Sequence, residues 1–376
     1  MTNDWKLGHR PGLDGLRGVA VLMVMLAHFQ VAGFSNAGRT GVSVFFVLSG
    51  FLITALLLEE HSREDSISLR GFWRRRFVRL LPALALLIAV AMALPLSSER
   101  PSPWALTGVV FYMGNWVQMS GESIEPFGQM WSLAVEEQFY VVWPIVVLLI
   151  VSRWSLRAAG WIISGMAATS LLWRVWLWNT HDDAPNRIYA ATDTNALLLL
   201  AGCALAVLFV RGVRVEVTPL IAAAAGVMLL VIGGILALLD PLLGTKFADL
   251  YDMGTFRYVA APALVALLAA AAIAYLAQHH SRVMTFAALV LIGRLSYGLY
   301  LWHWLVVHAY SKYVGRWPSG RLVETVGLFV VSFALAGASW LLVERPMMRF
   351  KASKVVDLRD QQPQKRPWPR TSPMPR

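Results

Sequence analysis

Arg17 and His28 lie eleven residues apart in the first apolar segment, RPGLDGLRGVAVLMVMLAHFQVAGF. On an α-helix, eleven residues make about three turns plus ~20° and rise ~16 Å, so both side chains project from one face. Ionisable side chains at membrane depth are costly and usually face a polar cavity. The pair would hold a charged head group near one membrane surface while the histidine acts deep in the segment. This spacing suits an acyl-coenzyme A whose arm is threaded inward.

The chemistry predicted for His28 is that of a general base. An imidazole titrates near neutral pH and can take a proton from an attacking hydroxyl. An isolated buried histidine is as often a core residue hydrogen-bonded between helices, but Arg17 on the same face favours the catalytic interpretation. Asp14 precedes Arg17 by one turn and is expected either to orient it or to cap the helix.

A second arginine group opens a later apolar segment, FWRRRFVRLLP at 72–82. Arg76 and Arg79 are three residues apart and share a helix face. Guanidinium groups bind phosphate through two parallel hydrogen bonds, which lysine cannot do. Coenzyme A carries a diphosphate and a ribose phosphate, so we expect these arginines to bind it. The alternative is an ordinary cluster of positive charge on the cytoplasmic side.

Two carboxylates open the segment WSLAVEEQFYVVWP at 131–144. Glu136 and Tyr140 are four residues apart on one face and are predicted to orient either the histidine or the incoming hydroxyl. The structural alternative is complete by itself, because Ser132 could cap the helix and the helix dipole would favour both carboxylates.

Three further residues carry weaker signals. Ser49 lies in GVSVFFVLSGFLIT, which predicts either close helix packing or a smooth wall for a substrate arm. His303 lies in LSYGLYLWHWLVVH and is more typical of a structural hydrogen-bond partner than of a second base. Cys203 is the single cysteine and is expected to be an inert packing residue. The eight histidines form no recognisable metal motif, so no metal is predicted.

The elements that must position these residues are membrane helices. The 376-residue chain is 57% hydrophobic and 15% charged, whereas a soluble domain carries about 25% charge. Apolar stretches long enough to cross a bilayer recur along the whole sequence. We therefore predict an all-α, polytopic membrane helix bundle with ten spans, at 18–34, 40–58, 78–96, 135–151, 158–178, 194–210, 219–239, 258–277, 286–308 and 322–343.

The placement of the basic residues predicts the topology. With the N-terminus in the cytoplasm, most of the 33 Lys and Arg residues fall on the cytoplasmic side, which favours both termini inside. Residues 1–350 would form the membrane domain. The basic, proline-rich tail 351–376 is expected to be disordered and attracted to the lipid surface, with no role for nucleic acid.

Together these segments resemble the membrane acyltransferase-3 family of bacterial polytopic O-acyltransferases. The matching segments are LDGLRGVAVLMVMLAH, VFFVLSGFLIT, RRFVRLLPAL, WSLAVEEQFYVVWP, SYGLYLWHW and VERP, in the family's order. The family's Arg-x10-His motif falls on Arg17 and His28, and its Arg-x-x-Arg motif falls on Arg76 and Arg79. Its tryptophan-to-tyrosine segment begins at Trp131 and assigns the acid to Glu136 rather than to Glu137.

The resemblance implies acyl-CoA as a cytoplasmic co-substrate, no permanently bound cofactor, a bacterial cytoplasmic membrane and a glycan or related hydroxyl acceptor. His28 and Glu136 would be catalytic, whereas Trp131 and Tyr140 would position substrate together with Asp14, Ser49 and His303. Many members carry an added extracytoplasmic hydrolase-like domain, which this chain is expected to lack. Acceptor specificity would then come from the membrane domain or a separate extracytoplasmic partner. A transporter or flippase of a sugar or lipid-linked intermediate is the competing function, and a non-catalytic scaffold fits poorly.

Overall fold

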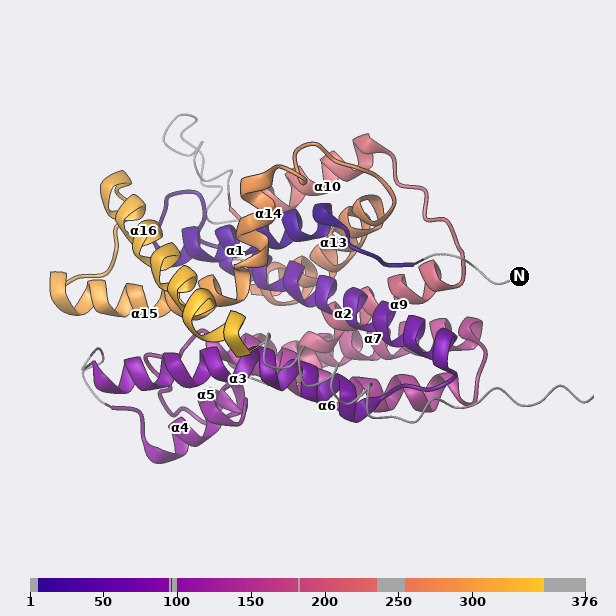
Figure 1. Ribbon diagram of the computed structural model, residues 1–376, viewed down its shortest axis with the longest axis horizontal. Helices are drawn as coiled ribbons and strands as arrows, with labels where there is room; N and C mark the ends of the chain where they lie inside the picture. Colours follow the sequence, from indigo (N-terminus) through magenta and orange to yellow (C-terminus); the bar gives the residue numbers. More distant parts are fainter. Residues whose placement is uncertain (1–5, 95, 97–99, 182, 235–253, 348–376) are drawn as a thin grey trace, which may run out of the picture.

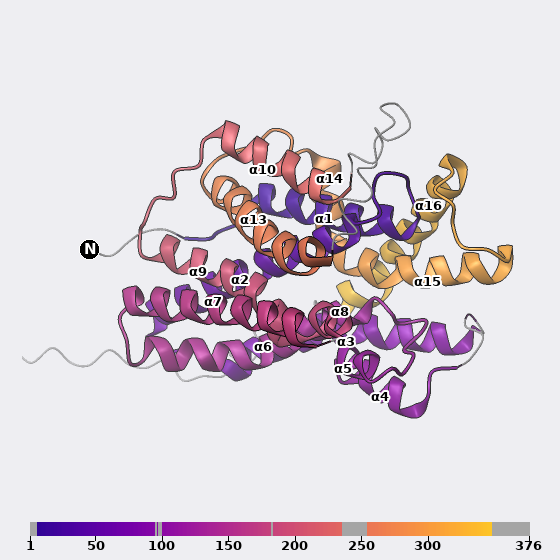
Figure 2. The same cartoon turned by 180° about the vertical axis from the view of Figure 1, so that it is seen from behind.

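The computed structural model describes residues 6–94, 96, 100–181, 183–234 and 254–347, and within these ranges it contains helices and loops but no strand. The expected tail, 351–376, lies outside the described residues. Most long helices run along the long axis of the molecule (Figures 1 and 2). The long helices are α1 Pro11–His28, α2 Ala37–Glu64, α3 Leu69–Ala93, α6 Met130–Val151, α7 Leu156–Thr180, α9 Thr192–Val210, α10 Pro219–Ile232, α13 Ala261–Gln278, α15 Ser296–Val314 and α16 Leu322–Ser339.

Shorter elements connect these helices. They are α4 Pro103–Val110, α5 Gly114–Met119, α8 Ala184–Ala190 and α14 Ala287–Arg294, with π-helical turns η2 Phe256–Ala260 before α13 and η3 Trp340–Glu344 after α16. The prediction of an all-helical membrane protein is therefore confirmed at the level of the fold class.

Six helical segments of the described chain are long and apolar enough to cross a membrane: α2, α3, α6, α9, η2 with α13, and α16 with its extension to Met347. A seventh crossing results if α14 and α15, which are bent by 73° at their junction, count as one span. A helix occurs in each of the ten expected segments, but α10 has only 14 residues. Ten crossings and cytoplasmic termini stay predictions.

The first helix differs from its expected position. The hydropathy pattern predicts a span over 18–34, whereas α1 covers Pro11–His28. Pro11 occupies the first helical turn, where proline's missing N–H costs nothing and its fixed φ suits the helix. The backbone leaves the helix after His28, and Gln30 has a positive φ of 60°. His28 is therefore the last residue of α1, and its expected depth in the membrane stays a prediction.

The close contact between α2 and α9 forms the middle of the bundle. A Cβ atom at Gly50 would collide with the backbone carbonyl of Leu199, and one at Gly202 would collide with that of Val47. Small residues let two helix backbones approach this closely. Cys203 is fully buried in the same contact, and its thiol donates to the Gly50 carbonyl at 3.5 Å. The expected packing roles of Gly50 and Cys203 are confirmed.

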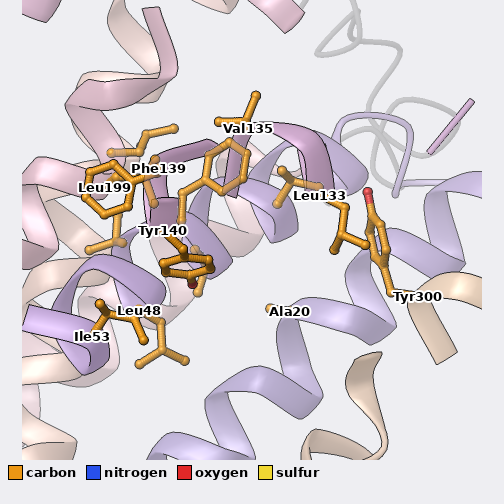
Figure 3. Packing of buried hydrophobic residues seen from close by; sticks show 14 of the residues in the cluster. Ala20, Leu48, Ile53, Leu133, Val135, Phe139, Tyr140, Leu199 and Tyr300 are labelled. Atoms are coloured by element: carbon orange, nitrogen blue, oxygen red, sulfur yellow. The ribbon is translucent and has the colours of Figure 1, made fainter. Parts of the chain in front are cut away.

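Apolar side chains fill the space around these helices. Figure 3 shows side chains of α2, α6 and α9 interleaved, with the tyrosine rings of Tyr140 and Tyr300 among them. Both tyrosines are buried, at 3% and 7% exposure. Buried tyrosines usually need a partner for the hydroxyl, and the partner of Tyr300 belongs to the site described next.

Candidate active site

A cavity of about 950 Å³ collects most of the residues that the sequence singled out. Its walls come from α1, α2, α3, α6 and the start of α15, and we call it the central cavity. Six predicted site residues line it: Arg17, Ser49, Arg76, Arg79, Glu136 and Tyr140. Segments as far apart as residues 17 and 300 thus meet around one polar space inside an apolar bundle.

In the central cavity, an ion pair and an aromatic ring fix the side chain of Arg76. Its Nε lies 3.0 Å and its Nη2 lies 2.8 Å from the two carboxylate oxygens of Glu137, in a bidentate pair. Its guanidinium carbon also lies 3.3 Å from the centre of the Tyr140 ring. Glu137 is only 6% exposed. Sequence reasoning missed this pairing because it treated Glu137 as a helix-start residue, and no local spacing links positions 76 and 137.

The neighbouring carboxylate, Glu136, has a different environment. Its Oε1 accepts a hydrogen bond from the Ser49 hydroxyl at 2.6 Å. Successive helical residues point about 100° apart, so Glu137 faces α3 while Glu136 faces α2 and the cavity. The structure therefore brings together Ser49 and Glu136, two residues that were predicted from separate motifs, and leaves Glu136 as the carboxylate not engaged with an arginine of α3.

A tyrosine and a serine close one side of the central cavity. The hydroxyls of Ser132 and Tyr300 lie 2.5 Å apart, and the Tyr300 hydroxyl also donates to the Gln129 carbonyl at 2.9 Å. The expected role of Ser132 as a helix cap is wrong, because α6 already begins at Met130. Its hydroxyl is used instead to join α6 to α15.

Asp14 forms its ion pair with Arg294. Its carboxylate lies 3.5 Å from Arg294 Nε and 3.2 Å from His9 Nε2. The cause is the bent pair α14 and α15, which carries Arg294 across the start of α1. The expectation that Asp14 orients Arg17 is therefore replaced by a contact that fastens α14 to α1, on the side of the bundle where α1 begins.

His28 is joined to the other predicted histidine. Its Nδ1 lies 2.8 Å from His303 Nε2, and the two rings stack with centroids 5.1 Å apart. The Trp304 ring lies 4.5 Å from His28. His303 is fully buried, and its Nδ1 lies 3.0 Å from the Leu299 carbonyl oxygen. The interpretation of His303 as a hydrogen-bond partner is confirmed, and that partner is His28.

The chain of contacts through His303 defines the protons on both rings. A carbonyl oxygen can only accept, so His303 carries its proton on Nδ1 and, when neutral, offers a lone pair at Nε2. His28 Nδ1 must then donate to that lone pair. The remaining nitrogen of His28, Nε2, holds the free lone pair, which is the state that a general base needs.

His28 is not among the described residues that line the central cavity. It is connected to that cavity through His303, whose ring contacts Tyr300 at a centroid distance of 5.6 Å. Within the continuous helix α1 it lies ~16 Å along the axis from Arg17. The expected pairing of a distant arginine with a histidine on one helix face is retained, with the histidine one layer of side chains beyond the cavity wall.

Trp131 lies in a second cavity, which we call the end cavity because it opens where α1 ends and α2, α6 and α9 begin. Trp131 packs against Tyr189 with ring centroids 4.4 Å apart. Val42 and Phe46 line both cavities and form their shared wall. Trp131 and Glu136 belong to the same predicted segment, and the structure places them in adjoining cavities.

Comparison with known proteins gives one family and a group of similar chains. The family model described as "Acyltransferase domain" matches residues 10–341. The chain is 32% identical over 363 residues to "Peptidoglycan O-acetyltransferase OatA" of Listeria monocytogenes and 31% identical over 357 residues to "O-acetyltransferase OatA" of Staphylococcus aureus. These matches cover 93% and 91% of this chain but only 57% and 58% of the relatives. No solved structure matches.

Proposed function

Because this chain belongs to the acyltransferase-3 family, we propose that it is a membrane O-acetyltransferase of the bacterial cell membrane. It moves an acetyl or other short acyl group from cytoplasmic acyl-CoA to a hydroxyl of a cell-envelope glycan or related acceptor. The observation that carries the proposal is the central cavity, in which Arg17, Arg76 and Arg79 lie with Glu136 inside an apolar helix bundle. The names of the similar relatives favour acetyl as the group and a polysaccharide as the acceptor.

In this proposal the three arginines bind the phosphates of coenzyme A. Three guanidinium groups from α1 and α3 face one cavity, and bidentate phosphate binding is the interaction for which arginine is best suited. Arg76 is already fixed by Glu137 and stacks on Tyr140, so its guanidinium plane is set before a ligand arrives. Preorganised cations of this kind lose little conformational entropy when the phosphate binds.

His28 then acts as the base. Its Nε2 accepts the proton of the acceptor hydroxyl while that oxygen attacks the thioester carbonyl. The new C–O bond forms, the C–S bond breaks, and the departing sulfur takes the proton back from His28 and leaves as coenzyme A thiol. The alternative sequence passes through an acyl-His28 intermediate: His28 Nε2 attacks the thioester carbonyl, coenzyme A leaves as the thiol, and the acceptor hydroxyl then attacks the acyl group and releases His28. His303 is a positioning residue in both, because it fixes the tautomer of His28.

Glu136 and Tyr140 would position the substrate in the central cavity. The carboxylate of Glu136, held by Ser49, can accept a hydrogen bond from the acceptor hydroxyl or from the amides of the donor's arm. No permanently bound cofactor takes part. A separate extracytoplasmic partner would supply further acceptor specificity.

The experiment begins with the detergent-purified protein and acetyl-CoA. Binding should raise the melting temperature by an amount that grows as RT ln(1 + [L]/Kd). Arg79→Gln should remove most of that shift, whereas Arg214→Gln, a loss of the same charge at an exposed position of a loop, should keep it. Peptidoglycan fragments are then added, and free thiol and acetylated product are measured. A transporter would release no coenzyme A, and that result would overturn the proposal.

A further inference from the structure

All charged side chains among the described residues that line the end cavity are basic. Its volume is about 650 Å³ with the open solvent at its mouth included, and Arg39, Arg174 and Arg257 line it. No aspartate or glutamate stands among its described lining residues. Arg39 and Arg174 repel one another in this shared space of low polarity, and a bound anion would offset that repulsion. The residues that line the end cavity therefore favour a negatively charged ligand.

Arg174 supplies the second observation. Its side chain is only 3% exposed, and a single guanidinium nitrogen, Nη2, donates within the protein, to the Ile188 carbonyl at 3.0 Å. Its Nε and Nη1 have no hydrogen-bond partner among the residues that the structure describes. Buried guanidinium groups that keep two donors unused are rare, because each loses its bonds to water without a replacement. The Nε–H and Nη1–H groups point from different edges of the guanidinium, so each can donate a separate hydrogen bond to an oxygen of a carboxylate or phosphate.

The carboxylate at the start of α9 already has partners. Asp193, in the first turn of α9, receives bonds from Arg187 at 2.7 and 2.6 Å and from the Trp173 indole at 2.9 Å. Figure 2 shows α7, which carries Arg174, running beside α9. Asp193 thus pairs with Arg187 outside the end cavity. Its carboxylate is therefore not used by Arg174, which can bind a ligand.

Arg39 faces the same space in a fixed orientation. Its guanidinium lies over the rings of Tyr189 and Tyr258 at 4.2 and 4.7 Å, and its Nη2 donates to the Tyr258 hydroxyl at 3.3 Å. Aromatic walls with a few polar groups are typical of a site for an organic molecule rather than for a bare ion. Asn195 adds a polar group on α9.

The position of the end cavity relates it to the reaction. Phe46 and Val42 separate it from the central cavity, and the Phe46 ring meets Trp131 edge to face at 6.2 Å. It also lies at the end of the bundle where His28 terminates α1. A molecule held there by its charged group would have its other groups one side-chain layer from the space assigned to the acyl donor.

We propose that the end cavity binds an oxyanion, a carboxylate or phosphate, of the acceptor, with Arg174 as the principal contact and Arg39 and Arg257 beside it. The acceptor is then an anionic sugar or glycolipid rather than a neutral one. The claim that the bound sugar is the acceptor rests on the proposed function, whereas the claim that the end cavity binds an anionic sugar does not. Both oxyanions offer negatively charged oxygens that accept hydrogen bonds from arginine, and separate probes distinguish them.

The test measures binding to the purified full chain with three probes: glucuronic acid, glucose 6-phosphate and glucose. We expect at least one anionic sugar to bind about tenfold more tightly than glucose. Arg174→Gln should remove that preference, and Arg214→Gln should keep it. Because Arg174→Gln could also loosen α7, the milder Arg39→Lys is measured in parallel and should weaken anionic binding severalfold while acetyl-CoA still raises the melting temperature.

Equal binding of all three sugars, or no binding of any, would overturn the inference, as would an unchanged preference in both arginine variants. The proposed function fails in a different way. If anionic sugars bind but acetyl-CoA neither stabilises the protein nor is consumed, the end cavity stands and the acyltransfer proposal falls. If acetyl-CoA binds and is consumed while sugars show no charge preference, only the present inference fails.

Discussion

His28 and His303 share one hydrogen bond, 2.8 Å long, between Nδ1 of the first ring and Nε2 of the second. The Leu299 carbonyl at the far side of His303 determines the direction of that bond, because it can only accept. Hydrogen bonds therefore connect the Leu299 carbonyl to His303 and His303 to His28, and they leave the free lone pair on His28 Nε2. This relationship links a core contact to the proposed chemistry.

His28→Ala should abolish transfer and leave donor binding in place. Removing a general base typically costs 10²–10⁴ in rate, while Arg17 lies about three helical turns away along α1 and Arg76 and Arg79 lie on α3. The measurement pairs coenzyme A release with the acetyl-CoA-induced rise in melting temperature. Full turnover in this variant would show that another group takes the proton.

Substitutions of His303 should distinguish a role in positioning His28 from a role in packing the core. His303→Leu fills the space but removes the acceptor for His28 Nδ1, so we expect turnover to fall about 10–100-fold through loss of the tautomer. His303→Gln keeps an oxygen that can accept, and it should recover part of the rate at similar stability. If both variants have the same turnover, His303 serves only to fill the core.

Arg76→Ala should destabilise the fold as well as weaken donor binding. It leaves the Glu137 carboxylate buried without its cation, a change that costs about 3–5 kcal/mol for pairs of this kind. Adding Glu137→Gln removes the uncompensated charge and should restore much of the stability without restoring donor binding. Chemical denaturation and acetyl-CoA binding, measured on both variants, test this. Recovery of binding in the double variant would assign Arg76 a purely structural role.

The adjacent glutamates should respond in opposite ways. Glu136→Gln keeps the size of a side chain that faces the central cavity, so turnover should fall while stability changes little. Glu137→Gln weakens the bidentate pair with Arg76, so stability should fall, by up to about 3 kcal/mol. Melting curves and turnover of the two single variants provide the comparison. Equal losses of activity at unchanged stability would contradict the division of roles.

Protonation of Glu125 should loosen the loop that supports Trp304. Burial raises the pKa of this carboxyl, but hydrogen bonds from His308 and from the Trp304 indole outweigh it and hold the pKa below its ordinary value of 4.5. A depressed pKa means that the stabilisation is present above pH 4.5 and is lost as the pH falls through the lowered value.

Melting temperature against pH measures this effect. The wild-type protein should lose more stability on acidification than Glu125→Gln, whose side chain has no charge to lose. Parallel curves for the two proteins would show that other carboxylates govern the acid limit.

Several features followed from the sequence because they are local. Apolar runs of membrane length predict helices wherever they occur, and the structure has a helix in each expected segment. The same-face relation of Arg17 and His28 needs only the geometry of one helix. Motif order pointed to the acyltransferase-3 family, which the match over residues 10–341 confirms.

The tertiary structure decided which side chains from different helices contact one another. Helical periodicity says which face a side chain occupies but not which helix packs against that face, so the pairs Arg76–Glu137 and Ser49–Glu136 could not be read from spacing. The 73° bend between α14 and α15 set the contact of Asp14 with Arg294. The grouping of Arg39, Arg174 and Arg257 depended on where α2, α7 and η2 meet, because packing energy is optimised over the whole bundle rather than within any one segment.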